Sequence, residues 1–393
     1  MFFKTQKDKI NLLFLLPSYT FGGAERTSLN LLSELNKDFF KINLATSGNI
    51  HKYFGHLDIE SFISIEDIGI DVWVNSYRKF LTDIKKIAKL LREIKPDIAF
   101  GMMHYPSALL VFAKKFYGIP VKIIVSPRGP SKEFMRFFIE KRTTKLFLQG
   151  IFTFFLKYAD GIVVASTGMK DECVRHFSAE KDKIAVIPNS VDVEDISNKA
   201  NEGIDIDLPQ NTFLLSAVSR LEKEKNLPFL LTAFSKVVQT EKAKLLIIGD
   251  GNQKSFLQSL SNELGINTDV IFSGYQENPY KFIKKSDVFI HTCLFEGFAN
   301  VIIEAMACGV AVIATDCPYG PRDIIKDKEN GFLVEMNNER ALSDSIIRLI
   351  KDDDLRYQIA QKGLLHSQSF SKKTMGESYK EFFLKIANKK IEK

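Results

Sequence analysis

The sequence predicts an α/β protein of two domains, each built on a doubly wound parallel sheet. Three observations lead to this fold class. The chain has 393 residues, which is more than one hydrophobic core usually supports. Apolar runs of strand length alternate with amphipathic stretches of helix length, as is typical of βαβ units. This alternation stops in the polar stretch 192–210 and then begins again.

In the first half, short apolar and β-branched runs mark the strands, and longer amphipathic segments mark the helices. We expect strands at 10–16, 41–46, 61–65, 97–102, 121–126, 161–166 and 184–188. We expect helices at 24–36, 77–94, 106–117, 133–157 and 169–177.

The second half repeats the same alternation after the polar stretch. We expect strands at 213–219, 244–249, 269–273, 287–292, 310–315 and 331–335. We expect helices at 228–239, 253–264, 279–285, 299–307, 339–351 and 354–364, and a last helix from about Lys372.

The composition is that of an ordinary globular protein, with 45% hydrophobic and 26% charged residues. The cysteines Cys173, Cys293, Cys308 and Cys317 lack C-x-x-C spacing, so we expect buried thiols in a reducing compartment and no structural zinc. The net charge of +6 is unevenly distributed. Residues 77–157 carry 17 Lys and Arg against 5 Asp and Glu, which predicts an anionic partner for the first half.

No segment is expected to span a membrane. The apolar run 12–16 follows three lysines, but it has only strand length and no convincing cleavage site comes after it. The most apolar stretch elsewhere, 146–156, is too short to cross a bilayer, which takes about 20 residues. We therefore expect a soluble or peripheral protein.

The strongest motif lies between two expected strands of the second half. Its loop carries Glu296 and Gly297, its helix begins near Asn300, and Gly309 ends that helix. The start of a helix offers unpaired N–H groups and a positive dipole to a phosphate. The motif therefore predicts a phosphate-binding turn.

Two carboxylates flank this helix start. Glu304 lies about one turn inside the helix, and its side chain leans toward the N-terminus, where it can reach hydroxyls such as those of a ribose. Glu296, in the loop, can accept hydrogen bonds from a sugar beyond a diphosphate. The alternative is a buried helix with two incidental acids.

This segment resembles the E-x7-E motif of the family-four retaining glycosyltransferases, which adopt the GT-B fold. The similarity continues through 316–325 and 330–334, where the sequence looks like that of members building bacterial polysaccharides or lipid-linked oligosaccharides. The resemblance implies that Glu296 positions the donor sugar and has a catalytic role. The residues that it implies for donor binding in this segment are Gly297, Phe298, Asn300, Val301 and Glu304.

A second segment follows the expected strand 213–219. Arg220 and Lys225 match the Arg and Lys of the family's G-R-L-x-x-x-K-G, which hold the donor diphosphate, whereas Ser219 and Asn226 replace its glycines. Two fixed cations can neutralise the charge of a leaving diphosphate without a metal ion. We therefore expect metal-independent catalysis that needs no cofactor; the alternative is a solvated, lysine-rich loop.

Three further positions match the family at the ends of strands. Gly23 opens a helix after the first strand, where the family places its loop against the donor phosphates and the acceptor. Gly251 resembles the second glycine of a G-x-G that lines the nucleotide pocket. His104 lies where many relatives have a histidine near the donor sugar, and a purely structural histidine is the alternative. The D-x-D at 205–207 lies in the polar linker, so we expect it to be solvated and not a metal site.

The stretch 132–158 combines seven phenylalanines with six Lys and Arg. Basic amphipathic helices rich in aromatic residues lie in membrane interfaces, so this stretch predicts contact with an anionic membrane surface. A core helix with a charged outer face is the alternative. Nucleic acid is not an expected partner, because no recognition motif is present.

Together, these features predict a retaining hexosyltransferase. We expect it to move a sugar from a nucleotide diphosphate donor, a UDP-sugar, onto a glycan or polyprenyl-linked acceptor. The expected product belongs to the biosynthesis of a cell-surface polysaccharide such as lipopolysaccharide or capsule. The resemblance implies an acceptor domain over 1–200, a donor domain over 201–371, a cleft between them, and a helix over 372–393 that packs back on the first domain. The expected location is cytoplasmic, at the inner face of the cell membrane. A nucleotide-sugar epimerase of the same fold and a non-catalytic nucleotide-sugar-binding subunit remain alternatives.

Overall fold

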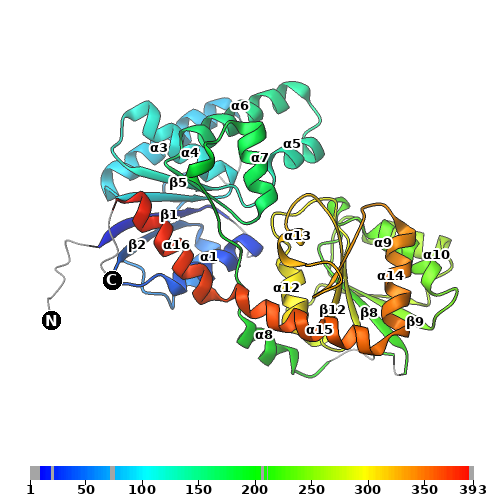
Figure 1. Cartoon of the computed structure of the whole chain (residues 1–393). Coiled ribbons are helices and arrows are strands. Elements are labelled where there is room, and N and C mark those ends of the chain that lie inside the picture. Colours follow the sequence, from blue (N-terminus) through cyan, green and yellow to red (C-terminus); the bar gives the residue numbers. More distant parts are fainter. Residues whose placement is uncertain (1–8, 19–21, 71–75, 205–207, 210, 389–393) are drawn as a thin grey trace, which may run out of the picture. The chain divides into compact units, whose positions relative to one another are not determined.

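The computed structural model describes residues 9–18, 22–70, 76–204, 208–209 and 211–388. The chain divides into two compact units, unit 1 with residues 1–190 and 372–393 and unit 2 with residues 191–371. Each unit is an α/β structure around a parallel sheet (Figure 1), so the predicted fold class is confirmed.

Unit 1 contains, within its described residues, a seven-stranded parallel sheet in the order β3-β2-β1-β4-β5-β6-β7. The strands are β1 (Ile10–Leu16), β2 (Phe40–Thr46), β3 (Ser61–Ser64), β4 (Ile98–Met102), β5 (Lys122–Ser126), β6 (Gly161–Val164) and β7 (Ile184–Val186). β1 pairs with β2 on one side and with β4 on the other, so the strand order reverses there. β1 is almost continuously apolar and buried, as a central strand covered on both faces should be.

The helices of unit 1 follow the expected alternation with two differences. They are α1 (Gly23–Glu34), α2 (Gly48–Phe54), α3 (Tyr77–Ile94), α4 (His104–Tyr117), α5 (Ser131–Phe138), α6 (Arg142–Tyr158), α7 (Thr167–Phe177), the 3-10 helix η2 (Lys181–Lys183) and α16 (Lys372–Ile386). The single helix expected over 133–157 is wrong, because the backbone is extended at Ile139 and Lys141, between α5 and α6. The sequence has no glycine or proline at this break. The short helix α2 was not expected.

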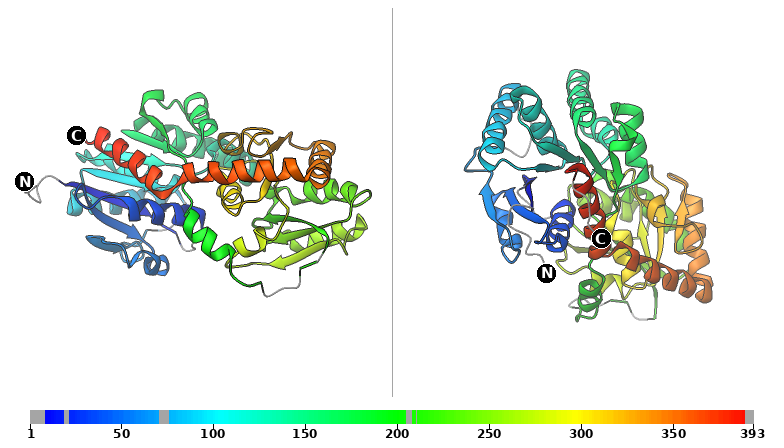
Figure 2. Two further views of the ribbon diagram at one scale, coloured as in Figure 1. Left: turned by 60° about the horizontal axis from the view of Figure 1, so that its bottom comes forward. Right: turned by 60° about the vertical axis from the view of Figure 1, so that its left-hand side comes forward.

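The last helix, α16, completes the core of unit 1. It packs against α1, as Figures 1 and 2 show. The rings of Tyr379 and Phe383 are fully buried and lie 5.9 and 5.5 Å from the ring of Phe100 on β4. Gly376 permits the close contact with α1, because a Cβ at this position would lie 2.5 Å from the Cβ of Glu34.

Unit 2 contains, within its described residues, a six-stranded parallel sheet in the order β10-β9-β8-β11-β12-β13. The strands are β8 (Phe213–Val218), β9 (Ala243–Ile248), β10 (Val270–Gly274), β11 (Val288–His291), β12 (Ala311–Thr315) and β13 (Phe332–Val334). The helices are α8 (Val193–Ala200), η3 (Lys223–Lys225), α9 (Leu227–Val237), α10 (Lys254–Glu263), α11 (Tyr280–Ile283), α12 (Asn300–Ala307), α13 (Pro321–Ile324), α14 (Glu339–Lys351), α15 (Asp353–Ser367) and η4 (Gln368–Phe370).

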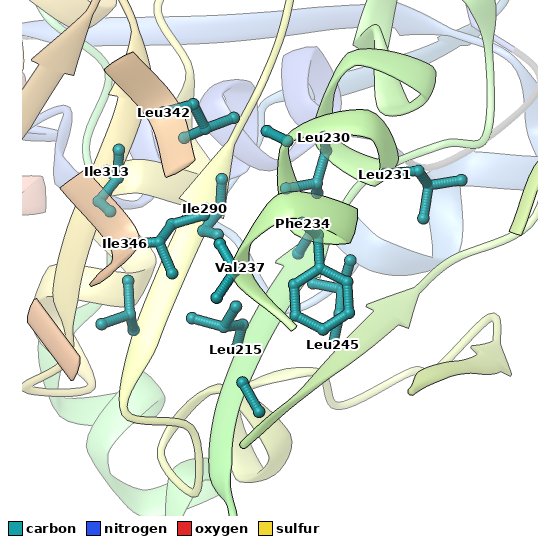
Figure 3. Close-up of a cluster of buried hydrophobic side chains, with 14 of the residues drawn as sticks. Leu215, Leu230, Leu231, Phe234, Val237, Leu245, Ile290, Ile313, Leu342 and Ile346 are labelled. Carbon is teal, nitrogen blue, oxygen red and sulfur yellow. The ribbon is translucent and has the colours of Figure 1, made fainter. Parts of the chain in front are cut away.

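Among these helices, α8, α13 and the short 3-10 helices η3 and η4 were not expected from the sequence. Residues 191–200, which the sequence analysis assigned to the first domain, lie in unit 2 because α8 packs against α11 and α12. The core of the unit lies between the sheet and the helices α9 and α14. Figure 3 shows this cluster, which includes Leu215, Leu230, Phe234, Val237, Ile290, Ile313 and Ile346.

None of the helices within the described residues is long and apolar enough to cross a membrane.

Candidate functional site

The strand order of unit 2 reverses between β8 and β11. β9 lies on the far side of β8, and β12 lies on the far side of β11. In doubly wound sheets, ligands bind beyond the carboxyl ends of the strands at such a reversal. The loops after β8 and β11 occupy that place, and these loops together with α12 hold most of the site residues expected from the sequence.

Lys225 and Glu296 meet across these two loops. The Lys225 Nζ donates a hydrogen bond to the Glu296 Oε1, and the two side chains are only 14% and 19% exposed. The loops are also joined through their backbones, because Leu294 N donates to Glu224 O at 2.9 Å and Thr292 Oγ1 donates to Lys225 O at 3.1 Å. The sequence placed both charged residues in the site but did not predict this ion pair.

The pair keeps both groups ionised. Burial alone would raise the pKa of Glu296, but the charge of Lys225 and the neighbouring His291 outweigh it and hold that pKa well below its ordinary value. Burial alone would lower the pKa of Lys225, but the charge of Glu296 outweighs it and raises that pKa. Glu296 is therefore a carboxylate that accepts hydrogen bonds and not an acid that donates a proton.

Arg220 lies in the same loop as Lys225 and differs from it in exposure. Its side chain is 73% exposed, and its Nη2 donates to the Oε1 of the buried Glu224 at 3.0 Å. Glu224 thus orients one edge of the guanidinium while the remainder faces solvent. The charge of Arg220 acts on Lys225, so the two cations lie near each other.

The loop after β9 packs against the loop that carries Arg220. A Cβ on Gly249 would lie 1.8 Å from Ser219 O, and a Cβ on Gly251 would lie 2.6 Å from Leu221 O. Leu221 N donates to Asp250 O at 2.9 Å. Gly251, expected in donor binding, is therefore a position where packing within unit 2 itself requires glycine.

The start of α12 is shaped by close packing. Ala299 adopts a left-handed conformation, with φ of 69°, directly before Asn300 at the first helical position. A Cβ on Gly320 would lie 2.7 Å from Phe298 O, so the loop after β12 presses on this turn. The Phe298 ring is buried and contacts Phe370, with ring centroids 5.8 Å apart. Phe298 can therefore meet a ligand through its backbone and not through its ring.

The other residues expected around this helix start fall into two groups. Gly297 and Val301 are half-buried, as is Asn300. Glu304, one turn into the helix, is buried. Glu296 thus lies in the loop before α12, and Glu304 lies about one turn inside the helix.

Two cysteines lie under the Lys225–Glu296 pair. Cys293 follows β11, Cys317 follows β12, and their Sγ atoms are 3.8 Å apart. Both side chains are fully buried, and burial raises the pKa of the Cys293 thiol well above its ordinary value. Thr315 Oγ1 joins the two strand ends through 3.0 Å hydrogen bonds with the backbone N and O of Cys293. Both cysteines are buried thiols, as expected.

His291 is a site residue that the sequence analysis missed. It is 3% exposed at the end of β11, and its Nε2 lies 3.5 Å from Glu296 Oε1. Within the described residues, this nitrogen has no hydrogen-bond partner. A histidine five residues before Glu296, at the end of an apolar strand, was the available signal.

In unit 1, Gly23 is the first residue of α1. Glu25 reaches back to accept a hydrogen bond from Gly22 N at 2.9 Å, which closes a capping box. Gly23 is exposed, and a Cβ there would meet nothing within 4 Å. The turn therefore leaves open space beside Gly23.

His104 begins α4 in unit 1. Its Nε2 lies 2.9 Å from Ser131 Oγ, and its ring stacks on those of Phe134 and Phe152 at centroid distances of 5.8 and 4.8 Å. Burial in this aromatic setting lowers the pKa of His104 to about 4. At neutral pH it is an uncharged group, held by packing and one polar contact.

The stretch 132–158 corresponds to α5, α6 and the break between them. Its buried side includes Met135, Ile151, Phe152, Phe155 and Leu156. Its outer side exposes the apolar residues Phe138, Leu146, Phe147 and Tyr158. The alternative of a core helix with a charged outer face thus accounts for some of the aromatic residues but leaves this exposed set unexplained.

The D-x-D at 205–207 lies outside the described residues.

Comparison with known proteins connects these features. Residues 163–365 match the family model described as "Glycosyl transferases group 1", and residues 21–195 match the model described as "Glycosyltransferase Family 4". The first match covers more than half of the chain and includes the whole β8–β12 region.

Individual proteins agree with these matches. The N-acetylgalactosamine-N,N'-diacetylbacillosaminyl-diphospho-undecaprenol 4-alpha-N-acetylgalactosaminyltransferase of Campylobacter jejuni subsp. jejuni serotype O:2 is 32% identical over 73% of this chain and 76% of its own. The UDP-Gal:alpha-D-GlcNAc-diphosphoundecaprenol alpha-1,3-galactosyltransferase of Escherichia coli is 24% identical over 89% of this chain and 90% of its own. The Anabaena protein HepE, solved in complex with UDP, has a TM-score of 0.75 at 19% identity, covering 96% of this chain and all of that one.

Proposed function

Since this chain belongs to the family of group 1 glycosyltransferases, we propose that it transfers a hexose from a UDP-sugar to a lipid-linked or polysaccharide acceptor, with retention of anomeric configuration. The observation that carries the proposal is the partly buried Lys225–Glu296 pair at the reversal point of the unit 2 sheet. A fixed ammonium beside an ionised carboxylate suits a substrate with an anionic leaving group and a polar sugar.

Each site residue has a chemical task in this proposal. Arg220, Lys225 and the N-terminus of α12 hold the diphosphate and stabilise the negative charge that grows on it as the sugar leaves. Glu296 accepts hydrogen bonds from the sugar hydroxyls and so orients the anomeric carbon. Glu304 accepts from the ribose hydroxyls. A neutral His104 contributes a hydrogen bond near the sugar without adding charge.

Retention follows from the same arrangement. The leaving diphosphate assists deprotonation of the incoming hydroxyl on the face that it departs from, so Glu296 positions the sugar without forming a stable covalent adduct. The two side-chain cations do the work that a divalent metal does in other transferases, and we propose that catalysis needs no metal ion.

The relatives support the donor and acceptor classes. The names of the C. jejuni and E. coli transferases both contain a diphospho-undecaprenol acceptor, and the second name contains UDP-Gal. We propose the same two classes here, a uridine nucleotide donor and a polyprenyl-linked acceptor.

The decisive experiment has a binding step and a turnover step. Thermal shifts with UDP, GDP and ADP identify the nucleotide, since a ligand that binds only the folded state raises the unfolding temperature. Transfer from the matching sugar nucleotide to a polyprenyl-diphosphate-linked sugar is then measured in EDTA, and NMR of the product gives the anomeric configuration. Turnover that stops in EDTA and returns with Mn²⁺, or an inverted product, would contradict the proposal, as would isomerisation of the donor without an acceptor.

We also propose that the outer face of α5 and α6 binds anionic membranes at the inner face of the cell membrane, where such an acceptor is anchored. The exposed set Phe138, Leu146 and Phe147 can enter the headgroup region, while Lys and Arg of the same stretch attract anionic lipid. Binding to anionic vesicles should exceed binding to neutral ones and weaken with salt. Replacing Leu146 and Phe147 by Ser should reduce it. Equal binding to both kinds of vesicle at low salt would rule the surface out.

A further inference from the structure

Three potential metal ligands of different chemistry converge beneath the proposed donor site. His291 Nε2, Cys293 Sγ and a carboxylate oxygen of Glu296 all lie within 4.8 Å of one another. Imidazole, thiolate and carboxylate are the ligands that proteins use for Zn²⁺. Cys317 lies next to this group, with its Sγ 3.8 Å from that of Cys293.

One separation among the three ligands is that of a tetrahedral metal site. A nitrogen and an oxygen at about 2.0–2.2 Å from the same ion are about 3.3–3.5 Å apart. His291 Nε2 and Glu296 Oε1 are separated by 3.5 Å. The Sγ atoms of Cys293 and Cys317 are separated by 3.8 Å, whereas a disulfide would need them about 2.05 Å apart.

The histidine supplies an independent indication of a ligand. A buried polar atom normally has a hydrogen-bond partner, because leaving it unpaired costs about 1–3 kcal/mol. His291 Nε2 is buried and, within the described part of the chain, has no such partner, while it faces the Glu296 carboxylate. A bound cation would satisfy this atom.

We propose that His291, Cys293 and Glu296 form a binding site for a thiophilic divalent cation of the zinc class, with Cys317 packed beside it, and that this cation inhibits the enzyme by taking Glu296 from Lys225. The second half of this statement rests on the proposed function. The first half, metal binding itself, does not.

Charge explains why the two cations exclude each other. The ammonium of Lys225 already neutralises Glu296 at close range. A divalent ion bound to the same carboxylate repels that ammonium, so Lys225 must turn away when the metal binds. The Cys293 thiol gives its proton to the solvent as it becomes a ligand. The site thus has two exclusive states, one that presents the Lys225–Glu296 pair to the donor and one that holds a metal.

The ligand chemistry also predicts selectivity. Soft thiolates favour Zn²⁺, Cd²⁺ and Co²⁺ over Mg²⁺ and Mn²⁺, which prefer oxygen ligands. We therefore expect Zn²⁺ to inhibit this transferase and Mg²⁺ to have no effect on it. A transferase with a catalytic metal would instead be activated by Mg²⁺ or Mn²⁺.

The binding test uses Co²⁺ as the probe and the full chain, freed of metal by chelation and kept reduced by a phosphine. We expect one Co²⁺ per chain, with thiolate-to-cobalt charge-transfer absorption. Cys293→Ala removes a ligand and should weaken binding by about 100-fold or more, and Cys317→Ala removes a neighbour of that ligand and should weaken binding by about 10- to 100-fold. Cys173→Ala, a buried thiol of unit 1, is the matched control and should leave binding unchanged. Absent absorption, or an equal loss in the control, would overturn the site.

The competition test uses Lys225→Met, which keeps the length of the side chain and removes its charge. Without the competing ammonium, Co²⁺ should bind about 10- to 150-fold more tightly, the range expected for a lost hydrogen bond to a charged group. Unchanged affinity would contradict the competition between Lys225 and the metal.

In transfer assays, Zn²⁺ should inhibit the wild type. The Cys317→Ala variant should transfer sugar in Zn²⁺ at the same rate as it does without metal. If no transfer is found under any condition, the absorption measurements still decide whether the metal site exists.

Discussion

The glycine turn after β1 in unit 1 and the glycine turn after β9 in unit 2 look alike in sequence but differ in structure. Gly22–Gly23 and Gly249–Gly251 each follow a buried strand, and each suggested that a ligand approaches the backbone closely. In unit 1, a Cβ on Gly23 would enter open space. In unit 2, a Cβ on Gly249 would lie 1.8 Å from Ser219 O.

The difference separates two physical reasons for glycine in a βα turn. At Gly249 and Gly251, the reason is internal, because the turn must pass against the backbone of the Arg220 loop. At Gly23, none of the described residues of unit 1 requires the absence of a side chain. We therefore infer that a ligand accounts for the glycine of unit 1, and that the glycines of unit 2 serve the ligand indirectly by fixing the loop that carries Arg220 and Lys225.

The largest effect is expected at Gly249. Its φ of 140° disfavours any side chain, and the Cβ of Gly249→Ala would overlap Ser219 O. Backbone strain and overpacking each cost about 1–3 kcal/mol, so the unfolding free energy should fall by about 2–6 kcal/mol in denaturant titrations. Nucleotide binding should weaken as well, because the Arg220 loop must shift.

Gly265→Ala is the control for backbone strain alone. Gly265 also has a positive φ, 69°, but a Cβ there meets nothing within 4 Å. Its stability loss should be about 1 kcal/mol, the cost of the left-handed conformation. If both variants lose the same stability, the close packing of the two loops is not what requires glycine at Gly249.

The second-largest effect is expected at the ion pair between Lys225 and Glu296. Glu296→Gln keeps the shape of the side chain but removes the charge that holds Lys225. We expect kcat to fall by about 100-fold or more, while free UDP binds with nearly unchanged affinity, because UDP lacks the sugar. The exposed Glu277→Gln in the same unit is the control and should leave both quantities unchanged.

Arg220→Ala separates catalysis from folding in the same loop. Because Arg220 is 73% exposed, its loss should change the unfolding free energy little. It should lower kcat and weaken nucleotide binding together, since a diphosphate is present in both measurements. Normal transfer in both Glu296→Gln and Arg220→Ala would place the site elsewhere.

How far the sequence predicted the fold depended on local signals. Helix α3 has the bounds expected from the sequence, 77–94, and its apolar stripe, which includes Phe80, Ile84 and Ile87, is regular. In the structure, Ser76 caps its first turn. The break between α5 and α6 was not predicted, since no breaker residue marks Ile139 or Lys141. Tertiary packing decides that break, and packing is not visible in the local sequence.

The elements of the site were predictable where they follow one another in the sequence and not where separate strands meet. Glu296 and Glu304 belong to one loop and the helix that follows it, and both elements were expected from the sequence. Cys293 and Cys317 are 24 residues apart and meet only because β11 and β12 are paired neighbours. Their spacing suggested no metal site, yet strand register brings them together beside His291.

A smaller effect is expected at His104 as the pH falls. Its pKa of about 4 in the folded protein lies below its ordinary 6.5, so in this interval the unfolded chain binds more protons. His104 therefore makes the folded state less stable as the pH falls from about 6.5 to 4, by up to about 1.4 kcal/mol for each pH unit. His104→Gln does not titrate and should lose this dependence. Parallel stability curves for the two proteins over this interval would show that the pKa is not lowered.

The smallest change in stability is expected at Gly23, where it tests the unit 1 side of the comparison. Gly23→Ala places a methyl group in open space at the first position of α1. Because alanine allows the unfolded chain fewer backbone conformations than glycine, the substitution should stabilise the protein by about 0.4–1 kcal/mol. Gly48→Ala, at the first position of α2 and equally open, should give the same gain. The two variants should differ in function. If a ligand fills the space beside Gly23, the methyl group obstructs it, and the KM for donor or acceptor should rise by about 10-fold in Gly23→Ala alone, equivalent to about 1.4 kcal/mol. Equal KM values in the two variants would mean that no substrate approaches this turn. Glycine at position 23 would then be required neither by close packing within the unit nor by a ligand.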